Sequence, residues 1–182
     1  MIKEFVFAGF GGQGVLTSGM ILATAGAIND MEVTWIPSYG SEMRGGTANC
    51  TVKLGNEEIP SPFAKHIDTL VAMNEVSLHR FAPMVKKGSG LIIVNSSIVH
   101  DIPVYEGVRV LNAPVNEISA GLGNERGSNV CVLGFVAAAT GIFTREALLE
   151  GIQHYFAQKG KATPANAAVF NAGFEYAEKE LA

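Results

Sequence analysis

The sequence has little charge of either sign, and this shortage already excludes several classes of protein. Charged residues make up 16% of the 182 residues, against about 25% in an ordinary soluble domain. The formal net charge of -4 argues against a nucleic-acid-binding module, which needs a basic face, and against a polybasic membrane anchor. A chain this poor in charge is expected to bury part of its surface against partner proteins.

Cysteine is also scarce. The two cysteines, Cys50 and Cys131, exclude a disulfide scaffold and a self-contained four-thiolate zinc or iron–sulfur site. Cys50 lies on the inward side of an expected strand and Cys131 in an apolar helix, so both are interpreted as small buried hydrophobic residues. Free thiols of this kind are typical of the reducing cytoplasm, which is the location we expect.

No uninterrupted apolar run is long enough to suggest a membrane segment. An uncharged stretch, residues 127–144, is broken by glycine, serine, asparagine and threonine, whereas a spanning helix needs about 20 mostly apolar residues. Residues 1–10 also lack the long apolar region and cleavage site of a signal peptide. We therefore predict a buried helix in residues 127–144 and no membrane association.

Segments typical of strands and helices alternate along the chain. The pattern predicts an α/β fold with a mostly parallel sheet flanked by helices, Rossmann-like, in a single domain of residues 1–182. A β-hairpin insertion is expected where residues 47–54 turn at Gly55-Asn56 and pair with Glu58 and Ile59. The expected strands are residues 4–8, 33–36, 47–54, 69–73, 91–94 and 108–111, and the expected helices are 15–28, 74–85, 129–139, 144–158 and 163 onward.

A glycine-rich loop, residues 9–14, separates the first strand from the first helix. Gly9, Gly11 and Gly14 have the G-x-G-x-x-G spacing, which allows a tight turn and offers backbone N–H groups at a helix N-terminus to an anion. Gly12 and Gln13 complete the loop, and the Gln13 amide is expected to bond a ligand or a neighbouring chain. Three interpretations stay open: close packing of helix on sheet, a phosphate-binding or partner-facing loop, and a dinucleotide site.

The dinucleotide interpretation is the weakest of the three. Proteins that bind NAD or FAD in this way place an acidic residue at the end of the second strand, where it bonds the ribose. The corresponding positions here are Trp35, Ile36, Pro37 and Ser38, with no acid among them.

A second polar loop, residues 37–46, follows the second strand. The carboxyl ends of parallel strands meet at one edge of a sheet, so this loop and the glycine loop should share one rim. We expect an ordered loop that is held by Tyr39 and presents Arg44 to an anion or a partner carboxylate; the alternative is a solvated loop with a weak ion pair. Its candidate residues are Ser38, Tyr39, Gly40, Glu42, Arg44, Gly45 and Gly46.

The two loops together resemble a known family. The segments GFGGQGV (residues 9–15) and SYGSEMRGGTANCTV (38–52) resemble the gamma subunit of 2-oxoacid:ferredoxin oxidoreductases and one internal domain of single-chain pyruvate:ferredoxin oxidoreductase. Three further segments extend the resemblance over nearly the whole chain. They are DTLVAMNEVSLHRF (68–81), SGLIIVNSS (89–97) and NERGSNVCVLGF (124–135).

The resemblance implies a subunit of an enzyme whose catalytic parts lie on other chains. Such enzymes decarboxylate a 2-oxoacid on thiamine diphosphate, pass electrons through 4Fe-4S clusters to ferredoxin, and transfer the acyl group to coenzyme A. Thiamine diphosphate, Mg and the clusters would be held by alpha, beta and delta-type subunits, which leaves this chain without a catalytic residue or metal. The two loops would pack on the catalytic subunits, at the entrance for coenzyme A or substrate, and overall similarity favours 2-oxoglutarate as the 2-oxoacid. The alternative function is a stand-alone NAD- or FAD-binding domain.

Overall fold

A computed structural model describes residues 1–40 and 46–182 of the chain. The described residues form a sheet in the order β2-β3-β1-β4-β5-β6, in which β1, β4, β5 and β6 are parallel. Strand β3 runs antiparallel to both β1 and β2. The strands are β1 (Ile2–Phe10), β2 (Glu32–Tyr39), β3 (Thr47–Gly55), β4 (Thr69–Ala72), β5 (Leu91–Asn95) and β6 (Arg109–Ala113).

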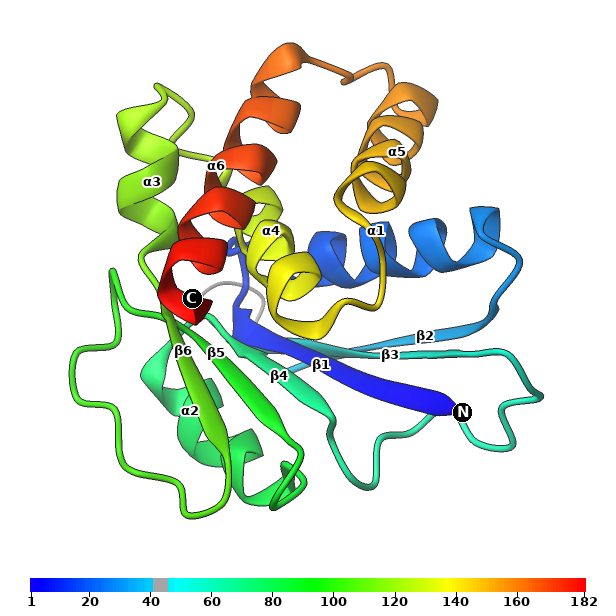
Figure 1. The fold of residues 1–182 in the computed structure, drawn as a ribbon, viewed down its shortest axis with the longest axis vertical. Coiled ribbons are helices and arrows are strands. Elements are labelled where there is room, and N and C mark those ends of the chain that lie inside the picture. The colour runs from blue at the N-terminus through cyan, green and yellow to red at the C-terminus, as the bar shows by residue number, and fades with distance from the viewer. Residues whose placement is uncertain (41–45) are drawn as a thin grey trace.

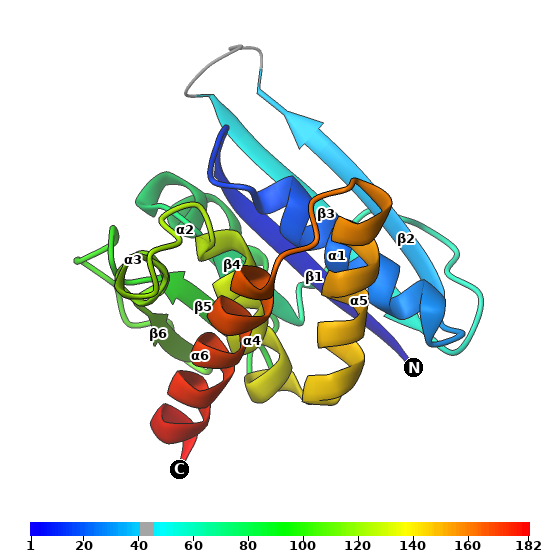
Figure 2. The ribbon, with the colours of Figure 1, turned by 90° about the horizontal axis from the view of Figure 1, so that it is seen from above.

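The helices cover the two faces of the sheet unequally (Figures 1 and 2). Five helices lie on one face: α1 (Val15–Ile28), α3 (Val115–Gly121), α4 (Ser128–Thr140), α5 (Arg145–Gln158) and α6 (Pro164–Leu181). The short helix α2 (Glu75–Phe81), continued by a 3₁₀ turn (Ala82–Met84), lies on the other face. This arrangement confirms the predicted α/β fold with a sheet flanked by helices.

Side chains of β1 alternate between two apolar cores, as the two-residue period of a strand requires. Phe5 and Phe7 enter the larger core beneath α1, α4, α5 and α6, whereas Val6 and Ala8 enter the smaller core beside α2. All four are at most 2% exposed. Strand β1 is therefore held firmly from both faces up to the point where the glycine loop begins.

Close helix crossings explain several glycines of the larger core. A Cβ at Gly173 of α6 would overlap the carbonyl oxygen of Cys131 in α4, and one at Gly134 would overlap the backbone of α6. The backbones of α4 and α6 are thus in direct contact. The residue 129–139 segment is the buried helix that was predicted, with Val130 to Ala137 buried.

Two details of the hairpin differ from the prediction. The antiparallel partner of β3 is β2, so the expected pairing with Glu58 and Ile59 is wrong; both lie in the coil of residues 56–66. Strand β2 also runs through Pro37 instead of ending there. Because β2 is an edge strand, the missing N–H of a proline is tolerated.

Two helices also differ. The helix predicted over residues 74–85 is shorter in the structure: α2 begins after Asn74, whose side chain accepts from the Ser77 N–H, ends at Phe81 and gives way to a 3₁₀ turn that contains Pro83. Helix α3 was not predicted, because its seven residues carry too short an apolar pattern to be recognised. The predicted helices 15–28, 144–158 and 163 onward begin at Val15, Arg145 and Pro164, and Thr144 and Thr163 are the N-caps of the last two.

Candidate functional site

The glycine loop turns the chain from the end of β1 into α1 through two left-handed residues. Gly12 has φ +99° and Gly14, the N-cap of α1, has φ +72°, a region that favours glycine. The Gly11 N–H donates to the Gly46 carbonyl oxygen at 2.9 Å. The two loops therefore meet at the carboxyl ends of β1 and β2, which confirms the expected common rim.

The Gln13 side chain bonds within its own chain. Its Oε1 accepts from the Phe10 N–H at 2.6 Å and from Asn74 Nδ2 at 3.1 Å, and its Nε2 donates to the Met73 carbonyl at 2.9 Å. The amide thus braces the loop against the end of β4, and its expected contact with a ligand or a neighbouring chain stays a prediction.

This arrangement disfavours a dinucleotide site. In doubly wound folds, the ligand binds where connections leave neighbouring strands toward opposite faces. Here those strands are β1, which leads to α1, and β4, which leads to α2, and the Gln13 carboxamide lies between their ends. Antiparallel β3 also separates β1 from β2, so the end of the second strand lies about 10 Å from β1.

Two of the three glycines in the motif are explained by close packing. A Cβ at Gly9 would lie 2.7 Å from Gln13 Oε1, and one at Gly14 would lie 2.7 Å from the Cβ of Asn129. The Ser18 hydroxyl adds a 2.8 Å bond to the Asn129 carbonyl, so α1 is joined to the first turn of α4. Helix packing therefore accounts for Gly9 and Gly14. Gly11 and Gly12, by contrast, are exposed at the tip of the loop.

A groove of about 670 Å³ opens beside the glycine loop. The starts of α1, α4 and α6 converge on it, and each helix start carries a partial positive charge. Arg126 and Lys161 add full positive charges, against one carboxylate at Glu125. The arrangement is suited to an anionic ligand. The groove is lined by Gly12, Gln13, Gly14, Thr17, residues 124–130, Phe156, Lys161, Thr163, Ala165 and Asn166.

Sequence reasoning missed Thr17, Lys161 and Thr163 as members of this site. Lys161 lies in the short link between α5 and α6, far from the glycine loop in sequence. Only the packing of α5 and α6 on α1 and α4 brings it to the groove, and no local motif signals that packing.

The second loop is described only at its two ends. Ser38 and Tyr39 end β2, and the Tyr39 side chain is 70% exposed. The Gly40 N–H donates to the Thr47 carbonyl at 2.8 Å, and Gly46 accepts from Gly11. Glu42, Arg44 and Gly45 lie outside the described residues, so the role expected of Arg44 stays a prediction.

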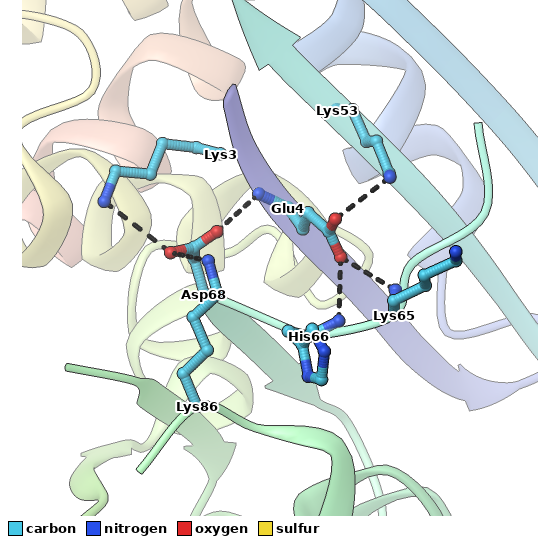
Figure 3. A network of polar contacts seen from close by, with 7 residues as sticks. All are labelled: Lys3, Glu4, Lys53, Lys65, His66, Asp68 and Lys86. Atoms are coloured by element: carbon cyan, nitrogen blue, oxygen red, sulfur yellow. Dashed lines mark hydrogen bonds and ion pairs between the residues drawn. The ribbon is translucent and has the colours of Figure 1, made fainter. Parts of the chain in front are cut away.

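A second polar cluster lies at the opposite end of β1 (Figure 3). Glu4 pairs with Lys53 at 2.9 Å and accepts from the backbone N–H groups of Lys65 and His66. Burial alone would raise the pKa of Glu4, but these donors outweigh it, and the pKa lies below its usual value. The neighbouring Asp68 binds the Glu4 N–H, and both Lys86 and Lys3 pair with it. The cluster joins the ends of strands β1, β3 and β4 that lie away from the two loops.

Both thiols are free and buried, and burial raises the pKa of Cys50 and of Cys131 to about 12. Within residues 1–40 and 46–182, no three metal-ligating side chains gather into a site. No helix in that part of the chain combines the length and apolar character that crossing a membrane requires.

Sequence comparison identifies relatives over nearly the whole chain. The family model described as pyruvate ferredoxin/flavodoxin oxidoreductase matches residues 4–176. The ketoisovalerate oxidoreductase subunit VorA of Methanothermobacter marburgensis is 36% identical over 176 residues, which cover 96% of this chain and 36% of the relative. The chain thus spans about a third of VorA. The 2-oxoglutarate synthase subunit KorC of the same organism is 31% identical over 160 residues, which cover 85% of this chain and 86% of the relative.

Solved structures share the fold. A keto/oxoacid ferredoxin oxidoreductase gamma subunit from Geobacter sulfurreducens matches with a TM-score of 0.80 at 23% identity, over 97% of both chains. A 2-oxoglutarate:ferredoxin oxidoreductase from Magnetococcus marinus matches with a TM-score of 0.86 at 23% identity, over 100% of this chain and 32% of that one. Because the family model covers nearly every residue, the chain belongs to the pyruvate ferredoxin/flavodoxin oxidoreductase family.

Proposed function

We propose that this chain is the gamma subunit of a multi-subunit 2-oxoacid:ferredoxin oxidoreductase. One observation carries the proposal: the chain aligns along most of its length with a separate subunit of such an enzyme, KorC, at 31% identity. In this role the chain holds no catalytic residue. Alpha, beta and delta-type subunits supply thiamine diphosphate, Mg and 4Fe-4S clusters, and ferredoxin accepts the electrons in the cytoplasm.

The groove gives the subunit a part in binding coenzyme A. Coenzyme A is bound in the Magnetococcus marinus enzyme, and 32% of that chain has the fold of this one. Its phosphates require positive charge, and the groove combines Lys161 and Arg126 with the starts of three helices. A volume of about 670 Å³ is within the range of ligand pockets. Lys161 and Arg126 would therefore bind the phosphates, while the glycine loop contacts the catalytic subunits.

The 2-oxoacid is selected elsewhere in the assembly. In this proposal the positive charges of the groove, Lys161 and Arg126, bind the phosphates of coenzyme A and not the 2-oxoacid. We keep 2-oxoglutarate as the first substrate to test, with ketoisovalerate beside it, because relatives with both names match.

Steady-state kinetics of the purified complex test the proposal. Replacing both Lys161 and Arg126 with alanine should raise KM for coenzyme A about tenfold, because each lost charge weakens phosphate binding by about 0.5–1 kcal/mol. KM for the 2-oxoacid should not change. Lys179→Ala on α6, away from the groove lining, is the matched control. An unchanged KM for coenzyme A in the double variant would remove the groove from the binding site.

A further inference from the structure

The Gln13 carboxamide lies where doubly wound proteins usually hold a cofactor. Strands β1 and β4 are parallel neighbours, with Ala8 opposite Ala72, and the chain leaves them toward opposite faces of the sheet (Figure 1). Such a division opens a crevice at the carboxyl ends of the strands. Three hydrogen bonds fix the carboxamide there: two to Oε1 and one from Nε2.

Asn74 extends this contact to a second helix. Its Nδ2 donates to Gln13 Oε1, and its Oδ1 accepts from the Ser77 N–H at 2.8 Å, which caps α2. Asn74 is 2% exposed, so a lost partner would leave a buried polar group unpaired and destabilise the folded chain. The glycine loop and the start of α2 are therefore coupled through one pair of amides.

The carboxamide fits where it does only because residue 9 has no side chain. A Cβ at Gly9 would approach Gln13 Oε1 at 2.7 Å, Val15 Cγ1 at 2.9 Å and Met73 Cβ at 3.0 Å. Gln13 is also one wall of the groove. A displacement of its side chain would move the groove wall and the exposed loop tip, Gly11 and Gly12, together.

We propose that Gln13, held by Asn74 and Met73, is a positioning residue that closes the switch-point crevice and fixes the glycine loop in the conformation in which it borders the groove. The functional part of this inference rests on the proposed function. The inference explains how a loop with the spacing of a dinucleotide motif can border the groove while the Gln13 side chain occupies the crevice that a dinucleotide would need.

The substitution Gln13→Glu tests the geometry with an almost unchanged shape. A protonated glutamic acid keeps one donor and one acceptor, whereas the ionised form directs a carboxylate at the Met73 carbonyl. That repulsion raises the pKa of the new carboxyl in the folded chain. Stability contributed by this group is therefore complete below its unfolded pKa and is lost as pH rises through its folded pKa. Gln153→Glu, exposed on α5, is the matched control.

Two measurements separate the inference from the proposed function. In the full chain alone, hydrogen exchange at the Phe10 amide, relative to wild type, should accelerate with rising pH in Gln13→Glu and not in Gln153→Glu. In the assembled complex, Gln13→Glu should raise KM for coenzyme A about tenfold at neutral pH, with kcat nearly unchanged and recovery at lower pH. Asn74→Ser, which keeps a good N-cap but removes the bond to Gln13, should act in the same direction and serves if Gln13→Glu does not fold.

If the Phe10 amide exchange rate of Gln13→Glu, divided by that of wild type, does not change with pH, Gln13 does not hold the glycine loop. This outcome would overturn the inference whether or not the chain assembles with partners. If Phe10 exchange accelerates with pH as expected but KM for coenzyme A stays at the wild-type value, Gln13 holds the loop without affecting the groove, and the positioning role would be overturned. A wild-type chain that never joins oxidoreductase subunits would refute the proposed function instead, and the exchange experiment would still decide whether Gln13 holds the loop.

Discussion

Replacing Lys53 with methionine should destabilise the chain through the carboxylate that it leaves behind. The Lys53 and Glu4 side chains are 7% and 15% exposed and pair at 2.9 Å (Figure 3). Removing one partner of a buried ion pair typically costs 3–5 kcal/mol. Because Glu4 keeps two backbone N–H donors, we expect a smaller loss, about 2.5 kcal/mol. For a chain of this size, that lowers Tm by about 7 °C.

The loss should depend on pH in a defined direction. The folded pKa of Glu4 is lowered by its donors, despite burial, so the stabilisation is present above the unfolded pKa and disappears as pH falls through the folded pKa. Urea unfolding of wild type, Lys53→Met and the double variant Glu4→Gln/Lys53→Met should therefore show a deficit that shrinks in acid and is partly recovered in the double variant. Lys87→Met, at an exposed position, is the control. A deficit that persists unchanged in acid, or a wild-type Tm for Lys53→Met, would refute this reasoning.

Three further predictions concern packing, the glycine loop and the thiols. Gly173→Ala should lower the free energy of unfolding by about 2 kcal/mol, because overpacking exceeds the gain in helix propensity. The control Gly121→Ala has open space around its added Cβ and should not lower it; equal thermal midpoints for the two variants would contradict the direct contact between α4 and α6. Gly14→Ala should lower the free energy of unfolding by about 2 kcal/mol, because residue 14 has a positive φ and an added Cβ would collide with the Asn129 side chain. An unchanged free energy in urea unfolding would count against the loop geometry. Cys50 and Cys131, with pKa values of about 12, should resist iodoacetamide at pH 8 until the chain is denatured, and rapid native labelling would show that they are accessible.

Much of the fold is predictable from local pattern because the signals are strong there. The starts of α1, α5 and α6 follow from a glycine loop, Thr144 as N-cap and Pro164 at the first helical position. The parallel arrangement of β1, β4, β5 and β6 follows from buried strands separated by helical or irregular segments. The partner of β3 could not be predicted in this way, because Glu58 and β2 are both near in sequence. In the structure β3 lies between β1 and β2, with Ala48, Cys50 and Val52 buried in the larger core.

The site was predictable only where a motif is local. The glycine loop and its contact with the second loop follow from spacing and strand direction. The groove could not be found, since Lys161, Arg126 and Thr17 meet only after three helices have packed. The internal bonds of the Gln13 amide could not be predicted, because its partners, Asn74 and Met73, lie 60 or more residues away in the chain.

Anaerobic co-purification of the tagged full-length chain from its native cells tests the central claim most directly. We predict that subunits containing thiamine diphosphate and iron–sulfur clusters elute with it in fixed proportion, and that the eluate reduces ferredoxin with a 2-oxoacid and coenzyme A. A chain that elutes alone, with a nucleotide bound and no such activity, would contradict the account.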